Sequence, residues 1–159
     1  MNRILFETQA PSYTLDARDP RFEHVRGVLR LRVGDGFDVG VVNGPAGKAF
    51  VEALDGRSLK VRVEWAGYPP EPPPIHLLVG LCRPATVRKI LTTVPSLGVR
   101  EILFPACGRS DAAYGRSRIW RDGEWRQRLI EGVEQGFGTA LPEVQRPGSL
   151  GEALEWLPA

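Results

Sequence analysis

The sequence has few cysteines and no long apolar run. Its two cysteines, Cys82 and Cys107, belong to no CxxC pair and have no histidine at metal-ligand spacing, which excludes a recognisable zinc site or disulfide framework. The apolar run at residues 75–81 is far shorter than the roughly 20 residues that cross a bilayer. The N-terminus reaches Glu7 without the apolar stretch of a secretory signal. We therefore expect no metal, no membrane span and a cytoplasmic location.

Charge is nearly balanced over the whole chain but not along it. The 159 residues have a net charge of only +2, which does not by itself indicate a nucleic-acid partner. Between Arg83 and Arg128, however, ten Arg or Lys residues face four acidic residues, a net charge of +6. Such a stretch favours an anionic partner, although a solvated surface explains the same count.

The first 65 residues predict a small β-barrel with one helix. Residues 4–6, 37–42, 49–54 and 59–65 are rich in strand-forming types, and turn signals separate them. Asp19 is a suitable helix N-cap, with Pro20 at the first helical position. Phe22, Val25 and Leu29 recur on one face of this helix, and Arg26 and Arg30 lie one turn apart on the other. We expect a basic rim on the barrel.

A proline-rich stretch divides the chain. Residues 68–74 hold five prolines in seven positions, which favours a stiff, extended connection and excludes a helix or a central strand. The sequence therefore predicts an α+β protein with a β-barrel at 1–67, a linker at 68–74 and an α/β domain at 75–159.

The second part predicts a parallel βαβ unit. Residues 75–81 indicate a strand covered on both faces, apolar residues at helical spacing follow between 87 and 94, and residues 99–104 indicate a second buried strand. A long helix is expected at about 122–135, with Trp125, Leu129 and Val133 facing inward, and a short one near the end. Two strands are too few to cover these helices, so we expect either a partner or further polypeptide to cover them.

Four segments together resemble the 16S ribosomal RNA uridine N3-methyltransferases, a branch of the SPOUT (trefoil-knot) methyltransferases with an N-terminal PUA-like barrel. The segments are His24-Val-Arg-Gly-Val-Leu-Arg-Leu-Arg-Val-Gly-Asp35, Val39-Gly-Val-Val-Asn-Gly44, Gly80-Leu-Cys-Arg-Pro-Ala-Thr-Val-Arg-Lys-Ile-Leu91 leading to Leu97-Gly-Val-Arg-Glu-Ile102, and Glu131-Gly-Val-Glu-Gln135 leading to Leu141-Pro-Glu-Val144. Their order across nearly the whole chain carries the resemblance, since none is specific alone.

The resemblance implies fold, cofactor and partners. It implies a PUA-like barrel followed by the N-terminal half of a SPOUT domain, S-adenosylmethionine as cofactor, 16S rRNA or the small ribosomal subunit as partner, and a homodimer. The family's Gly-Pro-Glu-Gly-Gly and Leu-Arg-x-Glu-Thr-Ala segments, which build the knot and hold the cofactor, do not occur here. The resemblance therefore places the cofactor site beyond Ala159 and predicts that the 159 residues alone are inactive. Gly136-Phe137-Gly138 also replaces a polar stretch of the family, which weakens any RNA contact from that loop.

The candidate RNA-binding residues are basic, because guanidinium groups match phosphate oxygens and RNA is held largely through its backbone. For each of them a solvated surface is the alternative, and for Arg88 and Lys89 the two readings are equally supported. The candidates are His24, Arg26, Arg30, Arg32 and Lys48 in the barrel, and Arg83, Arg88 and Lys89 around the end of the first buried strand.

Two residues are candidates for catalysis. Arg109 follows the second buried strand, where open α/β sheets place their ligands. It could stabilise the negative charge that uracil acquires on losing its N3 proton, or it could bind an RNA phosphate. Glu134, at the end of the long helix, is a candidate base or RNA contact, and a structural hydrogen bond is the alternative.

The leading hypothesis is S-adenosylmethionine-dependent methylation of a uridine at N3 in 16S rRNA. A non-catalytic RNA-binding module is the second. An unrelated α/β protein that binds a small phosphorylated ligand is the third, although no GxxxxGK loop is present.

Overall fold

The protein consists of two compact units, Met1–Pro69 and Pro70–Ala159, in a computed structural model that describes residues 2–157. The boundary lies within the proline-rich stretch. Each unit has its own sheet and its own hydrophobic cluster.

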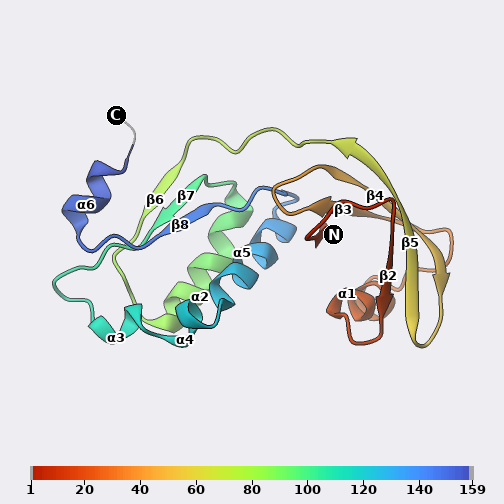
Figure 1. The fold of residues 1–159 in the computed structure, drawn as a ribbon, viewed down its shortest axis with the longest axis horizontal. Coiled ribbons are helices and arrows are strands. Elements are labelled where there is room, and N and C mark those ends of the chain that lie inside the picture. The colour runs from red at the N-terminus through yellow and green to blue at the C-terminus, as the bar shows by residue number, and fades with distance from the viewer. Residues whose placement is uncertain (1, 158–159) are drawn as a thin grey trace. The chain divides into compact units, whose positions relative to one another are not determined.

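The first unit is one curled five-stranded sheet with a short helical segment (Figure 1). Its strand order is β1-β3-β4-β5-β2, in which β1 pairs with β3 in parallel and the other neighbours are antiparallel. The elements are β1 (Ile4–Phe6), β2 (Ser12–Asp16), α1 (Pro20–Glu23), the π-helix η1 (His24–Val28), β3 (Gly36–Val41), β4 (Ala46–Leu54) and β5 (Ser58–Gly67).

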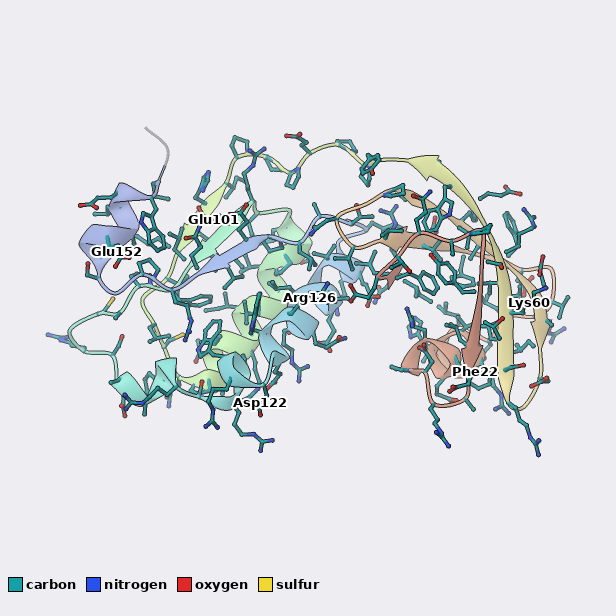
Figure 2. The ribbon with its side chains drawn as sticks, viewed as in Figure 1. Phe22, Lys60, Glu101, Asp122, Arg126 and Glu152 are labelled. Carbon is teal, nitrogen blue, oxygen red and sulfur yellow. The ribbon has the colours of Figure 1, made fainter. Side chains whose placement is uncertain are left out.

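Alternating strand residues and one helical face build the first core. Val39, Val61 and Leu59 project from the strands and are fully buried, because alternate residues of a strand point to one face. Phe22, labelled in Figure 2, and Val25 cover them from the helical segment. The expected cap is confirmed: the Asp19 carboxylate accepts a hydrogen bond from the Arg21 N–H at 2.9 Å, and Pro20 is the first helical residue.

The edges of this sheet are not joined by strand pairing. Among the described residues, β1 pairs only with β3 and β2 only with β5. The Phe6 and Tyr13 rings stack with centroids 3.7 Å apart, which brings the two edges together through side chains. The unit is therefore a curled sheet, and a closed PUA-like barrel stays a proposal. β2 was not predicted, because only Leu15 of its five residues is buried and its partner strand is more than 40 residues away.

The second unit has a three-stranded parallel sheet, order β6-β7-β8, with α2 and α5 across one face (Figure 1). The predicted parallel βαβ unit is confirmed. The elements are β6 (His76–Leu78), α2 (Pro84–Thr93), the 3-10 helix η2 (Val94–Leu97), β7 (Glu101–Leu103), α3 (Ala112–Gly115), α4 (Arg118–Arg121), α5 (Glu124–Gln135), β8 (Glu143–Gln145) and α6 (Leu150–Glu155).

One expectation for this unit is wrong. The strand predicted at 75–81 is not covered on both faces: β6 is an edge strand, its three residues are half-buried, and Ile75 is 50% exposed. The apolar faces of α2 and α5 are covered within the unit, where Val87, Leu91 and Leu129 are buried, whereas α6 leaves Leu150 and Leu154 exposed. The third strand, β8, helps to complete that core through Val144. It was not predicted, because polar residues stand at both of its ends.

The face of the sheet opposite α2 and α5 carries a polar network. Glu101, labelled in Figure 2, is 7% exposed. Its Oε2 lies 2.8 Å from His76 Nδ1 on β6, and its Oε1 accepts a hydrogen bond of 2.7 Å from Gln145 Nε2 on β8. Both oxygens are thus satisfied, as a buried carboxylate requires, and one side chain ties the three strands together.

Candidate nucleic-acid interface

The carboxyl ends of β6, β7 and β8 meet at one edge of the sheet, and we call residues 79–83, 104–111 and 146–149 the carboxyl edge. Backbone pairing continues past the strands here: Leu81 N–H donates to the Pro105 carbonyl at 2.8 Å, and Ala106 N–H to the Pro147 carbonyl at 3.0 Å. The Ser110 hydroxyl donates to the Leu81 carbonyl at 2.6 Å. These bonds hold the loops in place as a continuation of the sheet.

Arg83 and Arg109 both lie on the carboxyl edge and are exposed. No hydrogen bond or ion pair joins either guanidinium to another residue within 2–157. Two cations from different loops therefore share one edge and are available to an anionic ligand, and open parallel sheets place their ligands at this edge.

Arg88 and Lys89 are neighbours on α2, but within the part of the chain that the structure describes only Arg88 forms an ion pair. Arg88 makes a two-pronged ion pair with Glu124 of α5, with Nε 2.6 Å from Oε1 and Nη2 3.0 Å from Oε2. Arg88 therefore links two helices, which supports the structural alternative for this residue. Lys89 is exposed and stays a candidate contact.

The Glu124 carboxylate has a lowered pKa, chiefly because Arg88 donates hydrogen bonds to it, and Arg128 adds to the effect. A carboxylate whose pKa is lower in the folded state stabilises the fold above its unfolded pKa and loses that contribution as the pH falls through its folded pKa. We expect Glu124→Gln to be less stable than wild type at neutral pH, with the difference shrinking below about pH 4.3, the usual glutamate pKa. Urea unfolding of both proteins from pH 7 to pH 3 measures this, and a difference that is constant with pH would contradict it.

Glu134 and Arg109 are not brought together. Glu134 is half-buried near the end of α5, and the chain continues from there to the start of β8. The neighbouring Gly136 packs against Ser96, in the segment that precedes β7. Glu134 therefore lies at the amino-terminal edge of the sheet, opposite the carboxyl edge, so the two residues do not form one catalytic site within this unit.

The basic residues of the first unit are arranged differently from the prediction. Arg26 and Arg30 do not share a helical face, because the helix widens into the π-helix η1 and ends at Val28. The guanidinium of Arg26 lies 5.9 Å from the centre of the Phe22 ring. Arg30 follows the helix in a left-handed conformation, with φ of 54°. Arg26, Arg30 and Arg32 are all exposed, and His24 is half-buried.

The left-handed backbone of Arg30 makes it possible to separate the effect of its charge on RNA binding from its effect on stability. This conformation costs a residue other than glycine about 1–2 kcal/mol, whereas glycine loses about 0.5–1 kcal/mol through its flexibility. We expect Arg30→Gly to be as stable as wild type or up to about 1 kcal/mol more stable, and to bind RNA more weakly. Arg30→Ala keeps the strained backbone, so it should bind RNA as weakly as Arg30→Gly but without the increase in stability. Chemical unfolding and RNA titration of both variants test this, and unchanged RNA affinity would remove Arg30 from the interface.

Lys48 is exposed on the outer face of β4. Its cross-strand partners are Asp38 on β3 and Glu64 on β5. Two acidic neighbours lower the local positive potential, so Lys48 is the weakest of the basic candidates in this unit.

Sequence reasoning missed three exposed arginines near the carboxyl edge. Arg146 follows β8, and Arg116 and Arg121 belong to the segment of α3 and α4. The excess of positive charge between residues 83 and 128 was the signal for the last two. For Arg146 no signal existed, because β8 itself was not predicted.

Nothing in the described part of the chain suggests metal chemistry. Among residues 2–157, no group of three His, Cys, Asp or Glu side chains could hold an ion. Both cysteines are half-buried and unbridged, and burial raises the pKa of the Cys82 thiol, which keeps it protonated at neutral pH. No helix of the described residues is long and apolar enough to cross a membrane.

The fold is that of an α+β protein with exposed guanidinium groups at the carboxyl edge of a parallel sheet. In the comparison with known proteins, residues 69–159 match the RNA methyltransferase domain. The chain is 34% identical over 148 residues to the ribosomal RNA small subunit methyltransferase E of Treponema pallidum, which covers 91% of this chain and 56% of that protein. Because the domain match takes in more than half of the residues, the chain belongs to the RNA methyltransferase family.

Two solved structures share the fold. The putative methyltransferase of Legionella pneumophila, solved with bound S-adenosylmethionine, has a TM-score of 0.74 at 19% identity and covers 97% of this chain and 65% of that one. The ribosomal RNA small subunit methyltransferase E of Neisseria gonorrhoeae, also solved with S-adenosylmethionine, has a TM-score of 0.72 at 21% identity and covers 100% of this chain and 66% of that one. The chain thus spans between about half and two thirds of the length of these proteins.

Proposed function

We propose that this chain serves the S-adenosylmethionine-dependent methylation of a uridine at N3 in 16S rRNA. The observation that carries the proposal is the carboxyl edge, where exposed arginines from separate loops gather in a member of the RNA methyltransferase family. Residues 1–67, as a PUA-like domain, would grip the RNA, and residues 75–159 would contribute the first half of a SPOUT methyl-transfer domain. The similarity to a protein named as a ribosomal RNA small subunit methyltransferase supports rRNA methylation as the reaction class.

Arg109 has a chemical role in this proposal. Methylation at N3 requires loss of the N3 proton, which leaves negative charge on the uracil and its two carbonyl oxygens. The Arg109 guanidinium at the carboxyl edge would donate hydrogen bonds to that charge as it develops, where such donors are most effective. Arg83 and Lys89 would hold neighbouring phosphates, because contacts to the backbone position an RNA without reading its sequence.

The described residues do not by themselves fit the cofactor. S-adenosylmethionine supplies the methyl group from a positively charged sulfonium, which favours carbonyl or carboxylate neighbours. The carboxyl edge instead presents guanidinium groups, and its Asp111 carboxylate already caps α3 by accepting a hydrogen bond from Ala113 N–H at 2.8 Å. We therefore propose that residues outside 1–159 hold the cofactor.

This mismatch favours a second candidate, a non-catalytic RNA-binding module. Calorimetry with S-adenosylmethionine tests the mismatch: no binding by residues 1–159 is expected, and binding would contradict the mismatch and support catalysis by this chain. Methyl transfer measured in a form of the protein that binds the cofactor separates the two candidates, since only the first predicts a methylated uridine.

RNA binding itself is tested by salt dependence. With a 16S rRNA fragment, log K should fall linearly with log salt, because each neutralised phosphate releases counterions. A flat response would contradict both candidates and favour a small phosphorylated ligand.

A homodimer belongs to the same proposal. Leu150 and Leu154 of α6 are 49% and 56% exposed, and the following Trp156 is 42% exposed, so α6 offers apolar surface to a second copy. Sedimentation of the chain tests this, and a monomer at micromolar concentration would contradict it.

A further inference from the structure

Residues 112–121, which we call the α3–α4 segment, carry three arginines and no acidic residue. Arg116, Arg118 and Arg121 are all exposed. Arg118 is partly neutralised, since its Nε lies 3.2 Å from Asp122 Oδ2. In Figure 2, Asp122 lies on the side of the helices that faces away from the sheet. No ion pair or side-chain hydrogen bond joins Arg116 or Arg121 to another residue of the described chain.

The segment is held firmly although its helices are short. Ile119 is fully buried in the core of the second unit, and the Trp120 ring packs edge-on against Phe104 with centroids 5.5 Å apart. From beyond β8, the Arg146 guanidinium donates to the Gly115 carbonyl at 2.7 Å and lies 4.8 Å from the centre of the Trp120 ring. The backbone that carries Arg116 and Arg121 is therefore fixed from both sides.

These anchors place the segment next to the carboxyl edge. It follows the loop after β7 and leads into α5, and Figure 1 shows α3 and α4 near the start of α2. Arg146 connects it to the loop after β8. The segment with Arg116 and Arg121 thus lies at the same end of the second unit as the carboxyl edge.

We propose that Arg116 and Arg121 form a second RNA-binding surface that holds phosphates of the RNA backbone next to the target nucleotide. This inference rests on the proposed function. Because the backbone of the segment is already held, binding has to order only the arginine side chains, and arginine's planar donors match phosphate oxygens. The two short helices are anchored by their apolar residues and leave the arginines in solvent, so the contacts are with the RNA backbone and not with base edges.

The test uses the whole chain and a 16S rRNA fragment. Arg116→Ala, Arg121→Ala and the double variant are titrated at salt concentrations from 50 to 200 mM. Each lost phosphate contact should lower the slope of log K against log salt by about one unit, so that over this range each single variant loses about threefold less affinity than wild type and the double variant about tenfold less. Because backbone contacts carry no sequence information, the loss should be equal for an unrelated RNA.

Arg100→Ala is the matched control. It removes the same charge from the same unit, but Arg100 precedes β7 at the opposite edge of the sheet and pairs with Glu71 at 3.3 Å. The control should keep the wild-type slope, and circular dichroism should show all variants folded. A double variant with the slope of Arg100→Ala would overturn this inference and leave the proposed function standing. A loss confined to the 16S fragment would overturn the phosphate assignment. A wild-type chain without salt-dependent binding would overturn the proposed function as well.

Discussion

Replacing Arg109 with alanine is expected to slow methyl transfer to uridine N3 by about 100-fold to 1000-fold, the effect of removing one donor from a site where negative charge develops. Arg109 is exposed on the carboxyl edge, and the neighbouring Ser110 hydroxyl fixes its loop by donating to the Leu81 carbonyl at 2.6 Å. Because the loop is held, only the Arg109 side chain has to be ordered for its guanidinium to donate to the charge as it appears. Its loss should therefore lower the rate at saturating RNA.

Single-turnover transfer of a labelled methyl group, in a form of the protein whose wild type is active, measures this rate. Arg109→Lys keeps the charge and loses the planar donors, so it should recover part of the rate. RNA affinity distinguishes the alternative role. If Arg109→Ala weakens RNA binding but reaches the wild-type rate at saturation, Arg109 is a phosphate contact and the catalytic role is wrong.

Gly132→Ala is expected to destabilise the second unit by up to about 2 kcal/mol, which is the cost of about 1–3 kcal/mol for overpacking a core less the gain of about 1 kcal/mol that alanine normally brings to a helix. Gly132 lies on α5 where that helix meets the end of α2. A Cβ there would come within 2.5 Å of the Thr92 carbonyl oxygen and 3.1 Å of Pro95. The oxygen is a backbone atom, so the helices must move apart to admit the methyl group.

Gly151→Ala provides the same chemical change in another helix. The nearest atom to a Cβ at Gly151, in α6, is the Ser149 hydroxyl oxygen at 3.8 Å, which is an ordinary contact. This variant should be as stable as wild type or slightly more stable. Urea unfolding followed by circular dichroism compares the two. Equal stability of both variants would show that α2 and α5 do not pack as closely as described.

Local patterns predicted the elements that depend on neighbours in sequence. Asp19 and Pro20 marked the start of α1, and the apolar spacing around Leu91 and Leu129 marked α2 and α5, because capping and helical periodicity act within a few residues. β2 and β8 escaped prediction for the opposite reason. Each has mostly polar or exposed residues and becomes a strand only by pairing with a distant strand.

Some residues of the candidate site could be placed from the sequence, and others could not. Arg83 and Arg109 could be placed on one edge of a sheet from the sequence, since the ends of parallel strands meet there. The roles of Arg88 and Arg146 could not, because their partners Glu124 and Gly115 lie 36 and 31 residues away. Arg30 differed from prediction because a π-helix changes the register of every residue after it.

The sequence by itself determined that the chain has two parts, that the second contains a parallel βαβ unit, and that positive charge collects between residues 83 and 128. Only the tertiary structure decided which of those charges are available. It pairs Arg88 with Glu124, leaves Arg116 and Arg121 in solvent, and puts Glu134 at the far edge from Arg109. Composition and periodicity act along the chain, whereas the availability of a charge depends on which distant side chains folding brings within hydrogen-bonding distance.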